Sequence, residues 1–220
     1  MIKDNLLAFD NLINPYGEKV TLVGATKTQP VAIILDAINA GLKDIGENKA
    51  QEFRDKFPYL PPVNYHFFGR LQTNKVKYLI GKCCLIQSVD SIKLASEISR
   101  QSKNASVTTN ILLEVNAGEE QKGGFSISEL QNSYEQIKKM DNIVVKGLMT
   151  VLPKDEIKEN KVKFCLQLRN IYDIMKKEDS NFSVLSMGMS EDYPIAIECG
   201  SNMVRIGTKI FGERNYKEKT

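Results

Sequence analysis

The sequence predicts an α/β protein and, within that class, a single (β/α)₈ barrel of the TIM type. Short β-rich runs alternate with longer amphipathic stretches along the 220 residues, and roughly eight such units with parallel strands fill a barrel of this kind. No low-complexity linker or break in composition divides the chain, so we expect one domain over residues 1–220. An open doubly wound sheet is the structural alternative, because periodicity does not show whether a sheet closes.

The expected elements follow one another as repeated βα units. An extra N-terminal helix is expected within residues 1–19, ending near the turn-forming run Asn14-Pro15-Tyr16-Gly17, and residues 215–220 form a polar tail. Apolar residues at helical spacing predict helices between the strands, for example at 31–38, 94–98 and 164–171. The expected strands are 20–26, 44–46, 65–69, 84–88, 110–115, 143–150, 183–187 and 203–207.

Composition and charge exclude several classes of function. The chain has 30 basic and 27 acidic residues, a net charge of +3 and an isoelectric point near 8.5, and this balance argues against nucleic-acid binding. Cys83, Cys84, Cys165 and Cys199 show no CxxC spacing, so we expect reduced thiols and no metal site. Charges near the N-terminus oppose a signal peptide, and no stretch reaches membrane-spanning length. We therefore expect a cytoplasmic protein without a membrane segment.

Lys27 is the first candidate functional residue. A lysine chosen at random is a solvated surface charge, but this one follows the apolar run Leu22-Val23-Gly24-Ala25. In a barrel, functional groups cluster where the strands end. Lys27 is therefore expected in a half-buried place, where desolvation lowers the pKa of an amine and makes it nucleophilic.

A second group of candidates surrounds the ends of the last two expected strands. Arg205-Ile206-Gly207-Thr208 ends the last strand, and a Gly-Thr step there is commonly only a turn with a helix cap. In barrels, however, the loops after strands seven and eight frequently bind phosphate. Gly207 allows close backbone approach and Thr208 offers a hydroxyl. Ser190 can cap a helix that starts around 191–194, either as a plain cap or as part of an anion site.

Strands one and eight of a closed barrel are neighbours, so the sequence predicts a reactive amine beside an anion site. Pyridoxal 5'-phosphate (PLP) requires such a pairing, because its aldehyde reacts with lysine and its phosphate binds backbone N–H groups. A barrel that binds another phosphorylated ligand without a Schiff base is the alternative. His66, the only histidine, has no partner at metal-ligand spacing, and a packed or hydrogen-bonded side chain is favoured over catalysis.

The motifs along almost the whole chain resemble those of the pyridoxal phosphate homeostasis protein family. They are Thr26-Lys27-Thr28, Gly46-Glu47-Asn48, His66-Phe67-Phe68-Gly69 with Leu71-Gln72-Thr73-Asn74-Lys75, Lys122-Gly123-Gly124-Phe125, Gly147-Leu148-Met149, Leu185-Ser186-Met187-Gly188-Met189-Ser190-Glu191-Asp192 and the run from Gly200 to Gly212. The departures are small: Thr26 precedes the lysine where serine often stands, and Arg70 stands where proline is frequent.

The resemblance implies a fold-type III barrel like the N-terminal domain of alanine racemase, with PLP on Lys27 as a Schiff base. The resemblance also implies that Ser190, Gly207 and Thr208 hold the phosphate and that Arg205 faces the pyridine nitrogen. The remaining cofactor-binding residues expected around the pocket are Asn48, His66 and Met189.

The function implied is that of a PLP carrier and buffer with little or no catalytic turnover. An arginine opposite the ring nitrogen does not readily donate a proton, so the ring stays unprotonated and withdraws electrons weakly. We expect no second domain to supply the second base of a racemase. A small racemase-like enzyme acting on amino acids is the alternative. Free amino acids and apo forms of PLP enzymes are the expected partners of a monomer, and Lys122 is left without an assigned role.

Overall fold

Eight parallel strands form a closed barrel in which each strand pairs with its neighbours in chain order and β1 pairs with β8. The computed structural model describes residues 1–13, 20–119, 122–154 and 156–212. The strands are β1 (Thr21–Ala25), β2 (Asp44–Glu47), β3 (Asn64–Phe67), β4 (Leu85–Val89), β5 (Thr109–Glu114), β6 (Ile143–Met149), β7 (Val184–Ser186) and β8 (Met203–Ile206). The barrel prediction is confirmed, and the open sheet is excluded.

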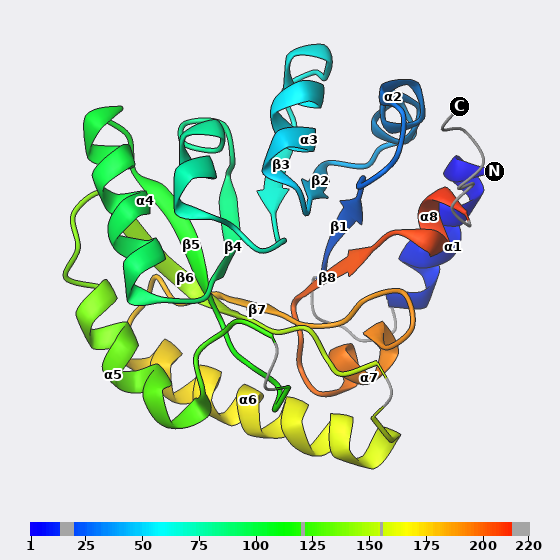
Figure 1. The fold of residues 1–220 in the computed structure, drawn as a ribbon. Coiled ribbons are helices and arrows are strands. Elements are labelled where there is room, and N and C mark those ends of the chain that lie inside the picture. Colours follow the sequence, from blue (N-terminus) through cyan, green and yellow to red (C-terminus); the bar gives the residue numbers. More distant parts are fainter. Residues whose placement is uncertain (14–19, 120–121, 155, 213–220) are drawn as a thin grey trace.

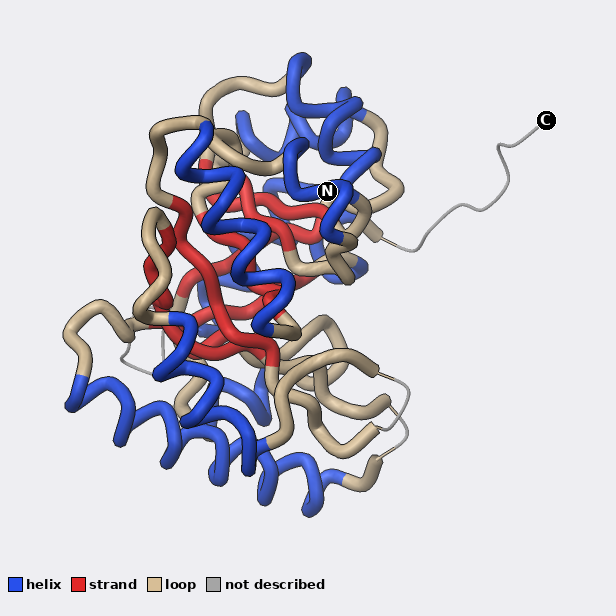
Figure 2. Tube along the Cα trace, turned by 60° about the vertical axis from the view of Figure 1, so that its left-hand side comes forward, coloured by secondary structure: helices blue, strands red, loops and turns tan. Residues whose placement is uncertain are grey.

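Helices surround the strands, as Figure 2 shows in blue around red. They are α1 (Ile2–Ile13), α2 (Val31–Asn39), α3 (Ala50–Lys56), α4 (Ile92–Asn104), α5 (Ile127–Ile137), α6 (Lys158–Glu178), α7 (Tyr193–Glu198) and α8 (Thr208–Phe211), with 3₁₀ helices η2 (Phe57–Tyr59) and η3 (Thr73–Tyr78). Between β3 and β4 the connection is η3 and contains no α-helix. Within the described part of the chain, no helix combines the length and the apolar character needed to cross a membrane.

The N-terminal helix α1 lies beside α8, the short helix that follows β8 (Figure 1). Asn5 Nδ2 donates to the carbonyl of Ile210 at 2.9 Å. Phe9 is buried, and its ring centroid lies 5.0 Å from that of Tyr193. The expected helix is therefore present over Ile2–Ile13, while residues 14–19 and the expected tail 215–220 lie outside the described residues.

The apolar core has two parts. The larger part lies between the strands and the helices and includes fully buried side chains such as Ile34, Tyr134 and Tyr172. The smaller part fills the barrel interior, and its buried members are Val23, Leu85, Leu112, Met149 and Met203. Alternation along each strand sends every second side chain inward, which is why these residues come from different strands.

A chain of polar side chains also crosses the barrel interior. Arg205 Nη1 donates to Ser186 Oγ at 2.5 Å, and Ser186 Oγ donates to Gln87 Oε1 at 2.7 Å. Gln87 Nε2 lies 3.1 Å from His66 Nδ1, and His66 Nε2 lies 3.0 Å from Asp44 Oδ1. All but Asp44 are buried, so the groups satisfy one another where water is excluded.

The order of donors in this chain assigns the state of the histidine. Because the Ser186 hydroxyl donates to the carbonyl oxygen of Gln87, the amide nitrogen of Gln87 faces His66 and donates to Nδ1. His66 Nδ1 is then an acceptor, and its proton resides on Nε2, which donates to Asp44. The same chain of hydrogen bonds orients Arg205, because Ser186 Oγ accepts from its guanidinium.

Ser186→Ala should lower the free energy of unfolding by about 2 to 4 kcal/mol, because buried polar groups that lose a partner cost about 1 to 3 kcal/mol each. The change leaves Gln87 Oε1 without its donor and removes one bond of Arg205. Ser99→Ala is the control, because Ser99 Oγ also donates one bond, to the carbonyl of Asp141 at an exposed place. Chemical denaturation of both variants measures the difference, and equal losses would show that the interior chain does not stabilise the barrel.

Candidate functional site

The carboxyl ends of β1 and β8 lie side by side and form the centre of the candidate site. The two strands pair in parallel with Gly24 opposite Ile206. A Cβ placed on Gly207 would lie 3.5 Å from the Cβ of Ala25, so the residue after β8 also lies beside the end of β1. Lys27 follows Ala25 by two residues and is half-buried. The strands that Lys27 and the Gly207-Thr208 turn follow are therefore neighbours in the fold, as expected for a closed barrel.

The loop after β7 reaches the same place through Ser190. The Gly207 N–H donates to Ser190 Oγ at 3.2 Å, which leaves the hydroxyl hydrogen of Ser190 for another acceptor. Thr208 is exposed and is the first residue of α8, with Gly207 as its N-cap. Ser190, Gly207 and Thr208 thus come together from two loops at one end of the barrel.

The expectation that Ser190 caps the helix after β7 is wrong. That helix, α7, begins at Tyr193, with Pro194 in its first turn, and its N-cap is Asp192. The Asp192 carboxylate accepts the Met189 N–H at 2.6 Å, which closes the loop that carries Ser190. Met189 and Ser190 are both half-buried in that loop. The helix starts within the expected range, but its N-cap is Asp192, and Ser190 Oγ instead accepts the Gly207 N–H.

Arg205 lies inside the barrel beneath this loop pair and is 4 % exposed. Its guanidinium donates to Ser186 Oγ at 2.5 Å, to the Ser186 carbonyl at 3.1 Å and to the Thr150 carbonyl at 2.7 Å. Burial lowers the pKa of Arg205 to about 10, opposed by the carboxylates of Glu114 and Asp192. Arg205 is therefore a cation at neutral pH and keeps its protons.

His66 is buried inside the barrel, whereas Asn48 is more exposed. Both ring nitrogens of His66 are engaged, one with Gln87 and one with Asp44, which agrees with the hydrogen-bonded interpretation favoured from the sequence. Asn48 is half-buried in the loop after β2. A Cβ on Gly69 would lie 1.9 Å from the Asn48 carbonyl oxygen, so only glycine lets the loop after β3 approach Asn48 so closely.

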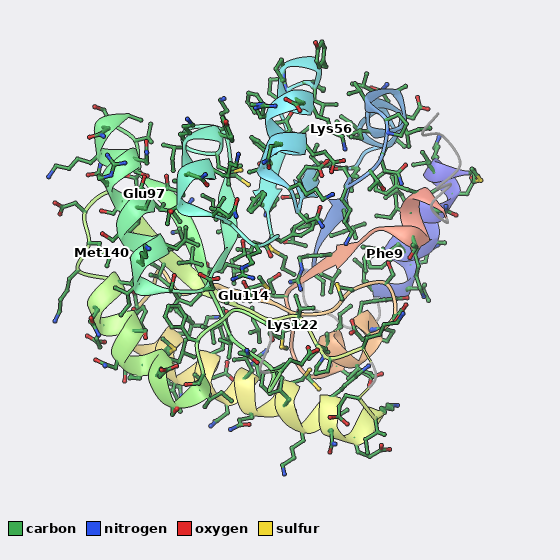
Figure 3. The ribbon with its side chains drawn as sticks, in the orientation of Figure 1. Phe9, Lys56, Glu97, Glu114, Lys122 and Met140 are labelled. Carbon is green, nitrogen blue, oxygen red and sulfur yellow. The ribbon has the colours of Figure 1, made fainter. Side chains whose placement is uncertain are left out.

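Glu114 is a functional candidate that sequence reasoning missed. It ends β5, and burial together with the nearby Asp90 raises its pKa to about 7, while Arg205, Arg70 and Lys122 act in the opposite direction. Figure 3 shows the labelled Glu114 and Lys122 near the middle of the molecule, in agreement with that electrostatic interaction. The available signal was a carboxylate at the end of an apolar strand, Ile111-Leu112-Leu113-Glu114.

Comparisons with known proteins agree with this geometry. The family model described as "Alanine racemase, N-terminal domain" matches residues 2–215. A protein of Aquifex aeolicus named "Pyridoxal phosphate homeostasis protein" is 44% identical over 199 residues, which cover 89% of this chain and 87% of that protein. These findings confirm the resemblance that the sequence motifs predict.

Solved structures share the barrel. PipY of Synechococcus elongatus PCC7942, solved with PLP bound, has a TM-score of 0.86 and 27% identity, covering 96% of this chain and 100% of PipY. An alanine racemase of Clostridium difficile 630 has a TM-score of 0.79 at 17% identity, covering 99% of this chain and 57% of the racemase, and it therefore shows the fold alone. With its closed barrel and a family match over residues 2–215, the chain belongs to the alanine racemase N-terminal domain family.

Proposed function

We propose that this protein binds PLP on Lys27 and serves PLP homeostasis as a carrier with little or no catalytic turnover. The observation that carries the proposal is the pairing of β1 with β8. Lys27 follows the end of β1, Gly207 and Thr208 follow the end of β8, and Ser190 is hydrogen-bonded to Gly207. The name of the Aquifex relative and the PLP in the PipY structure support the choice of ligand.

The residues present fit the three functional groups of PLP. The Lys27 amine condenses with the aldehyde, so that a carbon–nitrogen double bond forms and one water leaves. The Ser190 and Thr208 hydroxyls offer donors to a phosphate, and Gly207, whose N–H donates to Ser190 Oγ, has no side chain to obstruct the approach of the phosphate. Arg205 Nη1 and Nη2 donate to protein acceptors. Its remaining N–H groups, on Nε and Nη2, are the proposed donors to the pyridine nitrogen.

Arg205 also supports the carrier over an enzyme. PLP, when bound, supplies an aldehyde and a ring that withdraws electrons, and this withdrawal is strong only when the ring nitrogen is protonated. A guanidinium with a pKa of about 10 donates a hydrogen bond to that nitrogen without transferring a proton at neutral pH. Decarboxylation and transamination are therefore disfavoured.

A racemase-like enzyme is the second candidate, and Glu114 is the observation that favours it. Racemisation needs a base on each face of the substrate carbon. Tyr193 is buried with the Lys209 amine 4.8 Å above its ring, and His66 is hydrogen-bonded at both nitrogens, so neither is suited to this role. Glu114, with a pKa of about 7, accepts a proton near neutral pH.

The proposal extends to location and partners. We place the carrier in the cytoplasm as a monomer, consistent with its balanced charge and unpaired cysteines among the described residues. Its partners are PLP, free amino acids and apo forms of PLP enzymes. Met189, Asn48 and His66 contribute to the surroundings of the cofactor, His66 through the chain that orients Arg205.

Borohydride reduction of the protein incubated with PLP should attach the cofactor to Lys27, because that lysine follows the end of β1, the neighbour of β8. Lys27→Ala should lack the visible absorbance band of the lysine-bound cofactor and should change the free energy of unfolding by less than about 1 kcal/mol, since a half-buried amine contributes little to packing. Lys93→Ala, an exposed lysine of α4, is the control that keeps the band. Peptide mass mapping identifies the modified residue. Labelling of another lysine with Lys27 unmodified would contradict the assignment.

Amino acids should shift the absorbance of the PLP-loaded protein without sustained racemisation, decarboxylation or transamination. The amino group of the added amino acid replaces the Lys27 amine on the cofactor, but a second base is needed for racemisation. Chiral chromatography over many turnovers checks this expectation. Turnover that falls at least about tenfold in Glu114→Gln and disappears in Lys27→Ala would instead establish the racemase-like enzyme. An apo-enzyme that gains activity from the loaded protein would support delivery.

A further inference from the structure

The turn that carries Lys27 has a strained backbone. The Gln29 N–H donates to the Thr26 carbonyl at 3.0 Å and closes a four-residue turn with Lys27 and Thr28 at its centre. We call Thr26–Gln29 the Lys27 turn. Thr28 has a φ of +66°, which is the conformation that glycine normally provides at the third position of a type II turn. A β-branched residue in this region is unfavourable unless its surroundings hold it there.

Helix α3 contacts the Lys27 turn on both sides of the lysine. The Thr28 N–H donates to Glu52 Oε1 at 2.6 Å, and Lys56 Nζ donates to the Thr26 carbonyl at 2.8 Å. Lys56 also donates to Glu52 Oε1 at 2.6 Å and to Glu47 Oε1 at 2.8 Å. The three protons of the ammonium group are thereby used. Figure 3 shows the labelled Lys56 on α3, close to the first strands.

Glu47 connects the same group of charges to the sheet. Glu47 ends β2, and its Oε1 accepts the Thr26 hydroxyl at 2.8 Å. Burial raises the pKa of Glu47, and Lys56 provides the charge that opposes this shift. The side chains of Lys56 and Glu47 are only 13% and 5% exposed. Solvent and salt therefore weaken their attraction less than they weaken that of an exposed ion pair.

We propose that Glu52 and Lys56 are positioning residues for Lys27, holding Thr28 and Thr26 so that the strained Lys27 turn presents the amine to the cofactor. The inference rests on the proposed function of Lys27. Among the described side chains, Glu52 alone accepts a hydrogen bond from the Thr28 N–H. Loss of that bond lets Thr28 relax to a negative φ, which turns the following and preceding peptide groups and moves the lysine away from Gly207.

The test combines Glu52→Ala with Thr28→Gly. Glu52→Ala should slow the attachment of PLP to Lys27 about tenfold or more, because a charged hydrogen bond to the turn is lost. In the double variant, glycine adopts the positive φ without strain, and the rate should recover at least about threefold. A role of Glu52 in stability alone would leave the double variant as slow as Glu52→Ala. That result would overturn the proposal.

A measurement without PLP separates this inference from the proposed function. Acetic anhydride labelling of the cofactor-free protein, followed by mass spectrometry, reports the reactivity of Lys27 relative to Lys93. We expect Glu52→Ala to change this ratio at least about threefold. The variant should also speed amide exchange in the peptide that contains Thr28, since the Thr28 N–H loses its acceptor. Unchanged labelling and exchange would overturn the positioning role even if PLP binds Lys27. If wild-type protein binds no PLP, the proposed function fails while these changes still support the positioning role.

Glu97→Ala is the matched control. Glu97 is a helical glutamate that accepts from Arg100 three residues later in an exposed ion pair on α4, and it has no bond to the Lys27 turn. Its loss should leave both the PLP attachment rate and the Lys27 labelling ratio within about twofold of wild type. Equal effects of Glu97→Ala and Glu52→Ala would show a general response to charge removal and would contradict the proposal.

Discussion

The pairing of β1 with β8 is the contact on which the candidate site depends. Four residue pairs join these strands, from Thr21 with Met203 to Gly24 with Ile206. In an open sheet with the same strand order, the first and last strand would lie about 34 Å apart, because neighbouring strands are spaced by about 4.8 Å. A ligand the size of a cofactor could not then contact both Lys27 and Gly207. Closure of the barrel therefore creates the site rather than merely stabilising it.

Two polar networks approach the site from different directions. Inside the barrel, the chain from Asp44 through His66, Gln87 and Ser186 orients Arg205. Outside the strands, the charges of α3 hold the turn that carries Lys27. Burying polar and charged groups is unfavourable unless they are hydrogen-bonded, and in both networks nearly every group has a partner. The guanidinium of Arg205 and the backbone on both sides of Lys27 are thus held by hydrogen bonds to protein groups.

The sequence predicts the strands well and their polar partners poorly. Each expected strand overlaps an observed one, because apolar periodicity is a local property of the chain. Gln87 was missed, and so was the bond of Ser190 to Gly207, because both depend on residues that are distant along the chain. Ser186 and Gln87 are separated by 99 positions, and Gly207 and Ser190 by 17. No local pattern reveals which of many polar residues meet inside a barrel.

The sequence by itself determined the order of elements, the family, and the placement of Lys27 and Arg205-Ile206-Gly207-Thr208 at strand ends, since these follow from periodicity and short motifs. Tertiary structure alone decided what surrounds them. Thr26 and Thr28 meet Glu47, Glu52 and Lys56 only because β2 and α3 pack beside β1, over separations of 21, 24 and 30 residues. The strained turn that carries Lys27 and the buried guanidinium of Arg205 both need hydrogen-bond acceptors, because neither is stable without them. In both cases the acceptors come from residues that are distant along the chain.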